Sequence, residues 1–413
     1  MDGNMLEVSG LCIEYHNPDG KKKNTVLSDI SFDLPHGHVL GIAGESGSGK
    51  TSMAYALLRL IPLQKADIKG HAYFNTHENT SVDLFSVSDS EMQSIRGKRI
   101  SMIFQEPRSA FNPLFTCGNQ IAETVRRHFN VSKPESVLTA KTWLAKTDLS
   151  DPERIFQSYP HQLSGGQLQR AMIAMALCCK PSLLIADEPL ASSDYSNYQS
   201  LLNLFGRLKV ETGMSIIFIS HDWRAIEKMA DSVLVLHRGR VVEQGHLAKL
   251  VQTPGHSFTR QLMESRIDSL EEVKIHESGK VNQAENVPVL QVRHLKKIYK
   301  TKNTLTGTVH REMPAVENLS FELFRGETLG ITGESGSGKT TLARCICGLL
   351  QADAGEIIFN NRKIFPVNDD AFYNAARGKI QIVFQHPDTS LNPKQTIGEA
   401  IMEPLIYYGS RKY

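Results

Sequence analysis

The sequence predicts an α/β fold, in which apolar strands alternate with helices around a phosphate-binding loop, as one complete copy and the N-terminal part of a second. The first observation is that the pattern G-x-x-x-x-G-K-[ST] occurs in full twice, from Gly44 to Thr51 and from Gly333 to Thr340. The second is that each loop directly follows an apolar run typical of a buried strand, Val39 to Ala43 and Thr328 to Thr332. Because both loops also open a helical pattern, they favour phosphate binding over a Gly-rich surface turn.

The residue types of the two loops explain why they would hold phosphate. Glycines let backbone N–H groups turn inward around a β-phosphate, the next helix N-terminus adds positive potential, and the lysine reaches the β and γ oxygens. The helices are expected at Met53 to Leu60 and at Leu342 to Leu350. The expected phosphate-binding residues are Gly44, Ser46, Gly47, Ser48, Gly49, Lys50, Thr51 and Ser52 in the first copy, and Gly333, Gly336, Ser337, Gly338, Lys339, Thr340 and Thr341 in the second.

Length and composition are those of an ordinary globular protein. The chain has 413 residues, of which 40% are hydrophobic and 22% charged, enough for two or three domains, and the duplicated loop favours two. The net charge of +2 argues neither for nor against nucleic acid, and the six cysteines show no metal-ligand spacing. No apolar run approaches the roughly 18 residues needed to cross a bilayer, so we expect any membrane role to be played from the cytosol through a partner.

Segments of the chain that lie far apart in the sequence also resemble each other, as they do in proteins with duplicated domains. The segment from Leu6 to Tyr15 matches the one from Leu290 to Tyr299. We therefore expect a complete domain over residues 1–264, an exposed polar linker over 265–288 and a partial second domain over 289–413.

After the first loop, the stretch Leu163-Ser164-Gly165-Gly166-Gln167 precedes an apolar helical pattern from Ala171 to Leu177. Ser164 is a good N-cap residue, and a helix that starts with glycines offers free N–H donors and a positive dipole end to an anion. We expect Ser164, Gly165, Gly166 and Gln167 to contact a phosphate rather than merely to cap a helix.

Two adjacent carboxylates follow the apolar run that begins at Leu183. Side chains alternate along a strand, so Asp187 and Glu188 can serve different purposes. We expect Asp187 to hold Mg²⁺ beside Thr51 and Glu188 to polarise an attacking water, as phosphoryl transfer requires. The alternative is an acidic pair that opens a loop before Pro189.

Three further polar residues stand at the ends of predicted elements. His221 follows the apolar strand Met214 to Ser220, where a γ-phosphate contact would lie. Gln105 follows the strand Ile100 to Phe104, and Asp194 ends the turn after Glu188. Without the neighbouring motifs, the simplest interpretation of each of these residues would be a structural role.

Tyr15 and Tyr299 each end a strand-like segment ahead of a phosphate loop. We expect both to stack on adenine, although a tyrosine at a strand end packs on the core about as often.

Taken in this order, the phosphate loop, Gln105, LSGGQ, Asp187-Glu188, Asp194 and His221 resemble the nucleotide-binding domain of ABC ATPases. Within that superfamily, MIFQEPRSAFNPLFTCGNQIAE, YPHQLSGGQLQRAMIAMAL and the stretch Pro254-Gly255-His256-Ser257-Phe258-Thr259 resemble the importer ATPases for oligopeptides, dipeptides, nickel and glutathione. The second copy looks like the partner ATPase of the same systems, and fused pairs are known in the family.

The resemblance implies a P-loop NTPase core with an antiparallel β subdomain and a helical subdomain, acting on ATP with Mg²⁺. It implies catalytic roles for Glu188, His221 and Gln105. The implied magnesium-site residues are Thr51, Gln105 and Asp187 in the first copy, and Thr340 and Gln385 in the second, where Gln385 would also contact the nucleotide.

In this family each ATP lies between the phosphate loop of one domain and the LSGGQ of the other. The second copy has no LSGGQ, carboxylate pair or histidine, so two chains pairing through their first domains would form complete sites, whereas pairing within one chain would not. The hypothesis is that the chain is a truncated or incompletely read product whose hydrolysis rests on residues 1 to about 265. In the turn that ends at Asp194, the sequence differs from the Thr-Thr-Ala-Leu-Asp pattern that is usual in the family. This difference affects the same contact between domains.

The implied partners are transmembrane permease subunits, an extracytoplasmic solute-binding protein and a second ATPase domain, within this chain or in another. No nucleic acid is expected. The chain would lie peripherally on the cytoplasmic side of the inner membrane, with residues 106–160 as the helical lobe that touches the membrane subunit. Two alternatives stay open: a truncated, non-hydrolysing ABC fragment, and a soluble ABC protein that acts on ribosomes or DNA.

Overall fold

The computed structural model describes residues 3–16, 23–62, 64–75, 81–191, 195–264, 287–302, 309–333, 336–366, 379–384 and 390–409. The chain separates into two compact units, Met1–Val273 and Lys274–Tyr413.

A six-stranded sheet forms the centre of the first unit, in the order β10-β9-β3-β8-β7-β6. All neighbouring strands are parallel except β10, which pairs antiparallel with β9. Strands β3, β7 and β8 are buried along their whole length, as the continuous apolar runs predict for parallel strands covered on both faces. The strands are β3 (Val39–Ala43), β6 (Ile100–Ile103), β7 (Leu183–Asp187), β8 (Ser215–Ser220), β9 (Ser232–His237) and β10 (Arg240–His246).

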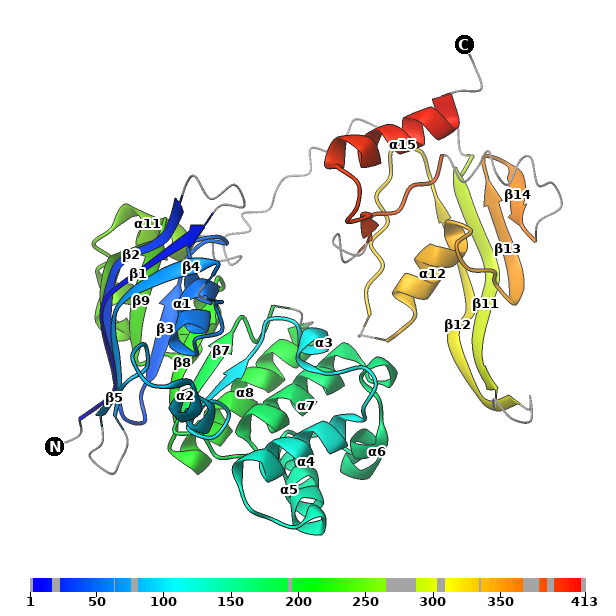
Figure 1. Ribbon diagram of the computed structural model, residues 1–413. Coiled ribbons are helices and arrows are strands. Elements are labelled where there is room, and N and C mark those ends of the chain that lie inside the picture. Colours follow the sequence, from blue (N-terminus) through cyan, green and yellow to red (C-terminus); the bar gives the residue numbers. More distant parts are fainter. Residues whose placement is uncertain are drawn as a thin grey trace. The chain divides into compact units, whose positions relative to one another are not determined.

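An antiparallel sheet with the order β2-β1-β4-β5 lies on one side of this central sheet (Figure 1). It packs with helix α1 against the face of the central sheet that carries Ile42, Ile185 and Ile219. This arrangement confirms the antiparallel β subdomain implied by the family resemblance. The elements are β1 (Asn4–His16), β2 (Lys23–Pro35), β4 (Ala66–Asn75), β5 (Ser81–Asp83), α1 (Lys50–Leu57) and α2 (Asp89–Ile95).

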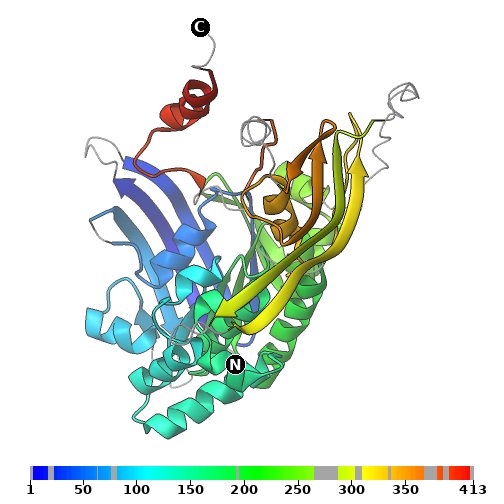
Figure 2. The same cartoon turned by 90° about the vertical axis from the view of Figure 1, so that its right-hand side faces the viewer.

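The opposite face of the central sheet is covered by helices. Figure 2 shows the helices between β6 and β7, in cyan to green, gathered at one end of the first unit, away from the blue antiparallel strands. Thr116, Ser132 and Asp151 each accept a hydrogen bond from a backbone N–H at the start of a helix in this lobe, which supplies partners for helix-end donors. The helices are α3 (Pro107–Ala110), α4 (Cys117–His128), α5 (Lys133–Lys146), α6 (Pro152–Gln157), η1 (Pro160–Gln162), α7 (Gly165–Leu177), α8 (Tyr195–Thr212), α9 (Trp223–Met229), α10 (Leu247–Gln252) and α11 (Ser257–Glu264).

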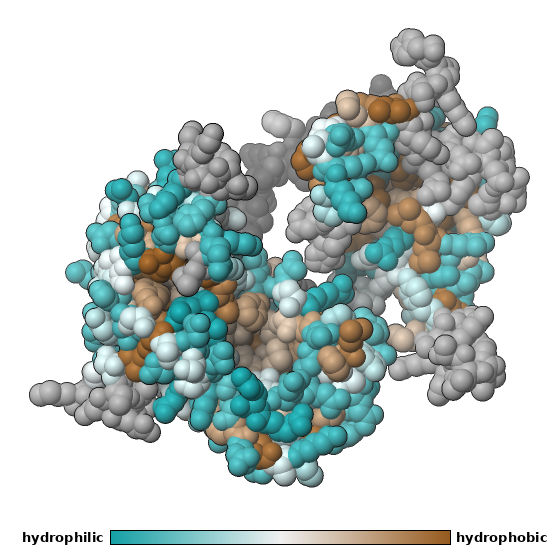
Figure 3. Space-filling model, in the orientation of Figure 1, coloured by the Kyte–Doolittle hydropathy of each residue, from teal (hydrophilic) through white to brown (hydrophobic). Residues whose placement is uncertain are grey.

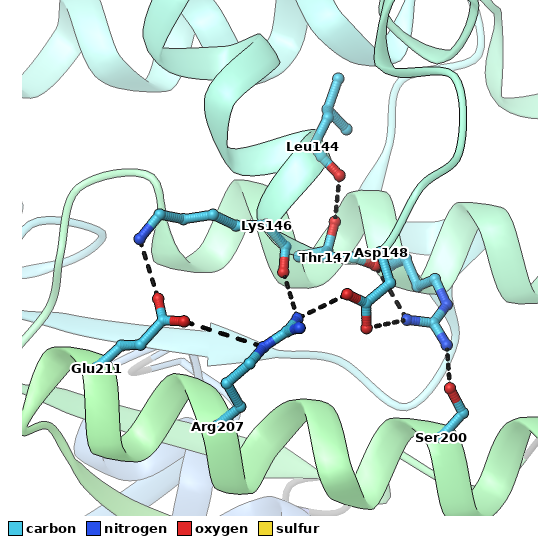
Figure 4. A network of polar contacts seen from close by, with 8 residues as sticks. Leu144, Lys146, Thr147, Asp148, Ser200, Arg207 and Glu211 are labelled. Carbon is cyan, nitrogen blue, oxygen red and sulfur yellow. Dashed lines mark hydrogen bonds and ion pairs between the residues drawn. The ribbon is translucent and has the colours of Figure 1, made fainter.

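Polar contacts tie the lobe to the rest of the unit, and Figure 4 shows Asp148, Ser200 and Arg207 among the residues that make them. Arg170 of α7 donates to the carbonyl of Thr147 at 3.0 Å and to the Ser200 hydroxyl of α8 at 2.8 Å. Asp148 bridges Arg170 at 3.4 Å and Arg207 at 2.7 Å. These contacts join the end of α5 to both α7 and α8 and so position the three helices relative to one another.

The second unit has a four-stranded antiparallel sheet, in the order β12-β11-β13-β14. Helix α12 packs on it around a small core that includes Val292, Leu342 and Ile357. Helix α15 exposes the apolar side chains Ile397 and Ile401. The elements are β11 (Leu290–Lys302), β12 (Val309–Leu323), α12 (Lys339–Ile346), β13 (Ala354–Phe359), β14 (Arg362–Phe365) and α15 (Ile397–Gly409).

The prediction of a strand at Thr328 to Thr332 is wrong, because these residues form no strand in the structure. In the first unit the equivalent strand, β3, pairs with β8 and β9 on its two sides. Among the described residues of the second unit, no strand pairs with 328–332, and Leu329 and Ile331 are 40% and 47% exposed. An apolar run becomes a strand only where neighbouring backbone satisfies its N–H and C=O groups.

In the part of the chain that the structure describes, no helix is both long enough and apolar enough to span a membrane.

Candidate nucleotide-binding site

The first phosphate loop lies between the end of β3 and the start of α1, as predicted. Gly49, at the N-cap of α1, has a φ of 101°, in the region that favours glycine. A Cβ atom at Gly49 would lie 2.5 Å from Leu27 Cδ2, and one at Gly44 would lie 2.3 Å from the carbonyl oxygen of Leu236. The left-handed φ at Gly49 and the close approach of the Leu236 backbone at Gly44 therefore require glycine at these two positions.

Lys50 is held inside this loop. Its side chain is buried, and its Nζ donates to the carbonyl oxygens of Gly44 and Glu45, both at 2.8 Å. Burial lowers the pKa of Lys50, while the carboxylates of Glu188, Asp187 and Glu45 act in the opposite direction. A cation wrapped by its own loop is poised to exchange these carbonyl contacts for phosphate oxygens.

Asp187, at the end of β7, is buried and faces Thr51. The Thr51 hydroxyl hydrogen-bonds to its carboxylate, while its Oδ1 atom has no hydrogen-bond partner. Burial raises the pKa of Asp187, and the bond from Thr51 opposes that rise. A buried, unpartnered carboxylate oxygen beside a hydroxyl fits Mg²⁺, which takes one or two carboxylates and completes its shell with water and phosphate. Among the described residues, no group of three His, Cys, Asp or Glu side chains could by itself hold a metal ion.

Glu188 directly follows Asp187 and adopts an uncommon backbone conformation. Its φ is 48°, a left-handed value that costs free energy for a residue other than glycine. Its backbone N–H donates to the carbonyl of Ile219 at 3.0 Å, which holds this conformation against β8. The side chain then reaches His221, with 2.7 Å between Glu188 Oε2 and His221 Nδ1.

This pair predicts a pH-dependent property of the nucleotide-free chain. The hydrogen bond to Glu188 raises the pKa of His221, and burial opposes the rise. Stability from the pair is fully present below the pKa of an unfolded histidine, about 6.5, and is lost as pH rises through the higher folded pKa. In an NMR titration, with the signal assigned by its absence in His221→Asn, we expect a midpoint above that of an ordinary histidine. Glu188→Gln should bring the midpoint down, and an unchanged midpoint would contradict the pairing.

A cavity of about 640 Å³ collects most of the predicted first-copy residues in one place. The residues that line it are Val26, Gly44, Glu45, Ser46, Gly47, Gly49, Lys50, Thr51, Ser52, Gln105, Glu188, His221 and Leu262. Ser48 lies within the same loop, and the Tyr15 hydroxyl donates to Ser52 Oγ at 3.3 Å. Sequence reasoning missed Val26, Glu45 and Leu262 as lining residues, and no local motif around Val26 or Leu262 would have revealed them.

Ser164, Gly165, Gly166 and Gln167 do not line this cavity. Ser164 is the N-cap of α7, and its hydroxyl accepts from the backbone N–H of Gln167 at 3.3 Å, while Gln167 Oε1 accepts from Ser164 N at 3.2 Å. Ser164 and Gly165 are exposed at the helix start. The predicted cap is confirmed, and contact with a nucleotide on a facing domain stays a prediction.

The second phosphate loop repeats several features of the first. Gly338 is the N-cap of α12 with a φ of 95°, Lys339 Nζ lies 2.7 Å from the carbonyl oxygen of Gly333, and the hydroxyls of Tyr299 and Thr341 are 3.4 Å apart. Gly336, Ser337 and Thr340 lie in the same loop and helix start, where most side chains are exposed. Asp194 and Gln385 lie outside the described residues.

A phosphate loop on a parallel sheet, a buried carboxylate beside the loop threonine and a carboxylate–histidine pair together define a P-loop NTPase. The chain belongs to the ABC transporter family, whose model matches residues 27–191 and 316–411.

Relatives and solved structures agree with this assignment. The chain is 40% identical over 425 residues to the glutathione import ATP-binding protein GsiA of Salmonella typhimurium, covering 98% of this chain and 68% of that protein. It is 38% identical over 426 residues to the GsiA of Shigella boydii serotype 4, with the same coverage. A dimeric, post-hydrolysis structure of the ATP-binding cassette MJ0796 with ADP and Pi matches 59% of this chain and 99% of its own, at 25% identity and a TM-score of 0.52. Membership of this family, together with the import ATP-binding proteins among the relatives, makes the chain an ABC-type transport ATPase, the ATP-binding subunit of an importer.

Proposed function

We propose that the first unit binds ATP in the cavity at Lys50 and hydrolyses it with Glu188 and His221. The observation that carries this proposal is that one cavity brings together the loop lysine, Gln105, Glu188 and His221, which lie far apart in the sequence. Lys50 would give up its carbonyl contacts for the β and γ oxygens, and the loop N–H groups would hold the β-phosphate.

The water-activating step falls to Glu188. Its carboxylate is largely buried and hydrogen-bonded to His221, so the proton of an attacking water can pass to Glu188 while His221 holds the carboxylate in place and faces the γ-phosphate. Thr51 and Asp187, with Gln105, would hold Mg²⁺, which when bound neutralises charge on the β and γ oxygens. Tyr15 would stack on adenine. Thr340 and Lys339 would serve a second nucleotide in the same way.

The nucleotide would be closed over by a facing domain. Ser164 and Gly166 at the start of α7 would contact a γ-phosphate held by that domain, since this helix end is exposed and offers N–H donors. Pairing of two chains through their first units would supply these contacts to both cavities.

The transported solute we propose is glutathione or a related small peptide, because the chain is 40% identical to a glutathione import ATP-binding protein over 98% of its length. The chain would lie on the cytoplasmic side of the inner membrane beneath transmembrane permease subunits, which receive solute from an extracytoplasmic binding protein. Leu114 and Phe115, between α3 and α4, are 77% and 54% exposed and suit a contact with a membrane subunit. Figure 3 shows hydrophobic colour on the surface around α3.

An uptake experiment tests this proposal. In cells that lack glutathione import, the chain expressed with its permease subunits and binding protein should restore uptake of labelled glutathione, and the Lys50→Ala chain should not. Uptake of a labelled dipeptide or of nickel instead would reassign the solute within the same family.

Membrane fractionation separates the importer from a soluble ABC protein. We expect the chain in the membrane fraction only when the permease subunits are coexpressed. Sedimentation with ribosomes irrespective of the permease would contradict the proposal, and absence of ATP turnover in the assembled complex would favour a non-hydrolysing fragment.

A further inference from the structure

Helix α11 lies beyond residues 27–191, the part of the first unit that matches the family model, yet it reaches the phosphate loop. Leu262 of α11 lines the same cavity as Lys50 and Glu188. Among the described residues that line the cavity, Val26 and Leu262 carry the apolar side chains. The segment from Pro254 to Thr259, which includes the first residues of α11, has no role in the function proposed above.

The start of α11 is anchored to the central sheet. Glu243 of β10 accepts hydrogen bonds from the backbone N–H of Gly255 at 2.7 Å and of His256 at 3.0 Å. His256 Nδ1 in turn accepts from the backbone N–H of Phe258 at 3.1 Å. A Cβ atom at Gly255 would lie 3.3 Å from Glu243 Oε1, so glycine allows the backbone to come this close to the carboxylate. One glutamate therefore determines where the helix begins.

The first turn of α11 is also linked to the phosphate loop. The buried Phe258 ring packs on His237 at the end of β9, with 4.1 Å between ring centroids. His237 Nδ1 lies 3.9 Å from Glu45 Oε2 in the loop. The carbonyl of Leu236, one residue earlier, is the group that a side chain at Gly44 would meet. The helix is thus packed behind the loop and presents Leu262 to the cavity.

We propose that α11 is a wall of the nucleotide cavity, in which Leu262 makes an apolar contact with the nucleoside part of ATP and Glu243 is the positioning residue for the helix. This inference rests on the proposed function, that the cavity takes ATP. Leu262 is half-buried without ligand, so a nucleoside against it would cover apolar surface that now faces water. A ligand of phosphate groups alone has no nucleoside, so this contact would add nothing to its binding free energy.

The test measures binding of Mg·ATP to the full chain by calorimetry, with Glu188→Gln present to prevent turnover. Leu262→Ala should weaken ATP binding roughly 3- to 10-fold, while Leu262→Met, which conserves volume, should restore most of the affinity. Met263→Ala is the matched control, because Met263 is also partly buried on α11 but does not line the cavity. Binding of inorganic tripolyphosphate should be the same in all these variants.

The positioning role of Glu243 is tested by a double-mutant cycle. Glu243→Ala should weaken ATP binding when Leu262 is present and change it little when Leu262 is already alanine. Equal losses in both backgrounds, or equal ATP affinities of Leu262→Ala and Met263→Ala, would overturn the inference. Weakened tripolyphosphate binding in Leu262→Ala would also overturn it, because the defect would then lie in the loop.

Lys50→Ala separates this inference from the proposed function. If that variant binds ATP normally, the proposed cavity itself is wrong. If Lys50→Ala loses ATP binding while Leu262→Ala binds ATP as tightly as the control Met263→Ala, only the inference about α11 fails. Should Leu262→Ala not fold, as judged by thermal unfolding, Leu262→Val provides the same comparison with a smaller expected loss.

Discussion

Glu188→Gln is expected to stop ATP turnover while leaving ATP binding intact. The substitution keeps the size of the side chain and removes the carboxylate that would accept a proton from the attacking water. General-base contributions of this kind are typically about 10²- to 10⁴-fold, so we expect a fall in kcat of that order with little change in the Kd for ATP. Single-turnover hydrolysis and calorimetric titration of the same preparation measure the two quantities.

The geometry at Glu188 explains why no neighbour should replace it. The left-handed backbone of Glu188 and its hydrogen bond to His221 direct the Glu188 carboxylate into the cavity. The neighbouring carboxylate of Asp187 instead faces Thr51. Glu211→Gln, on the exposed side of α8, is the control and should leave turnover unchanged. Unchanged turnover in Glu188→Gln would remove this residue from the role of water activator.

Lys50→Ala is expected to weaken ATP binding at the first loop by about 100-fold or more, roughly 3 kcal/mol. The reason is that Lys50 is the one loop residue that brings a full positive charge to the β and γ oxygens from a buried position. Its removal also leaves the Gly44 and Glu45 carbonyls without their lysine partner. ATP titration of the full chain measures the effect.

The second copy offers the matched control. Lys339→Ala removes the equivalent lysine, which donates to Gly333 in the same way but lies in a loop with more exposed neighbours. We expect this variant to keep the ATPase rate of the unaltered chain, as the hypothesis that hydrolysis depends on the first unit requires. A large loss of rate in Lys339→Ala would mean that the second loop takes part in hydrolysis.

Much of the site could be predicted from the sequence because its parts are local motifs. The loop from Gly44 to Thr51, the N-cap at Ser164 and the carboxylates at the end of β7 each depend on residues a few positions apart. Glycine conformations, helix caps and strand ends are decided by such short-range geometry. The roles of these residues in binding and catalysis stay predictions.

Two outcomes lay beyond local reasoning. The apolar run from Thr328 to Thr332 resembles β3 in sequence but is not a strand, since a strand depends on hydrogen-bonding neighbours that are distant in the chain. Leu262 was missed as a cavity residue because it reaches the loop only through the packing of α11 on β9 and β10.

The sequence by itself determined the class of the protein, the order of its motifs and the chemistry available to them, because glycine, lysine and carboxylate functions follow from residue type and short spacing. Only the tertiary structure decided which residues meet. The pairing of Glu188 with His221, 33 positions apart, arises from β7 and β8 lying side by side in one sheet. Leu262 approaches a loop more than 200 residues earlier through the packing of α11 on β9 and β10. Parallel strands bring their carboxyl ends to one edge regardless of the length of chain between them, and that edge is where this cavity forms.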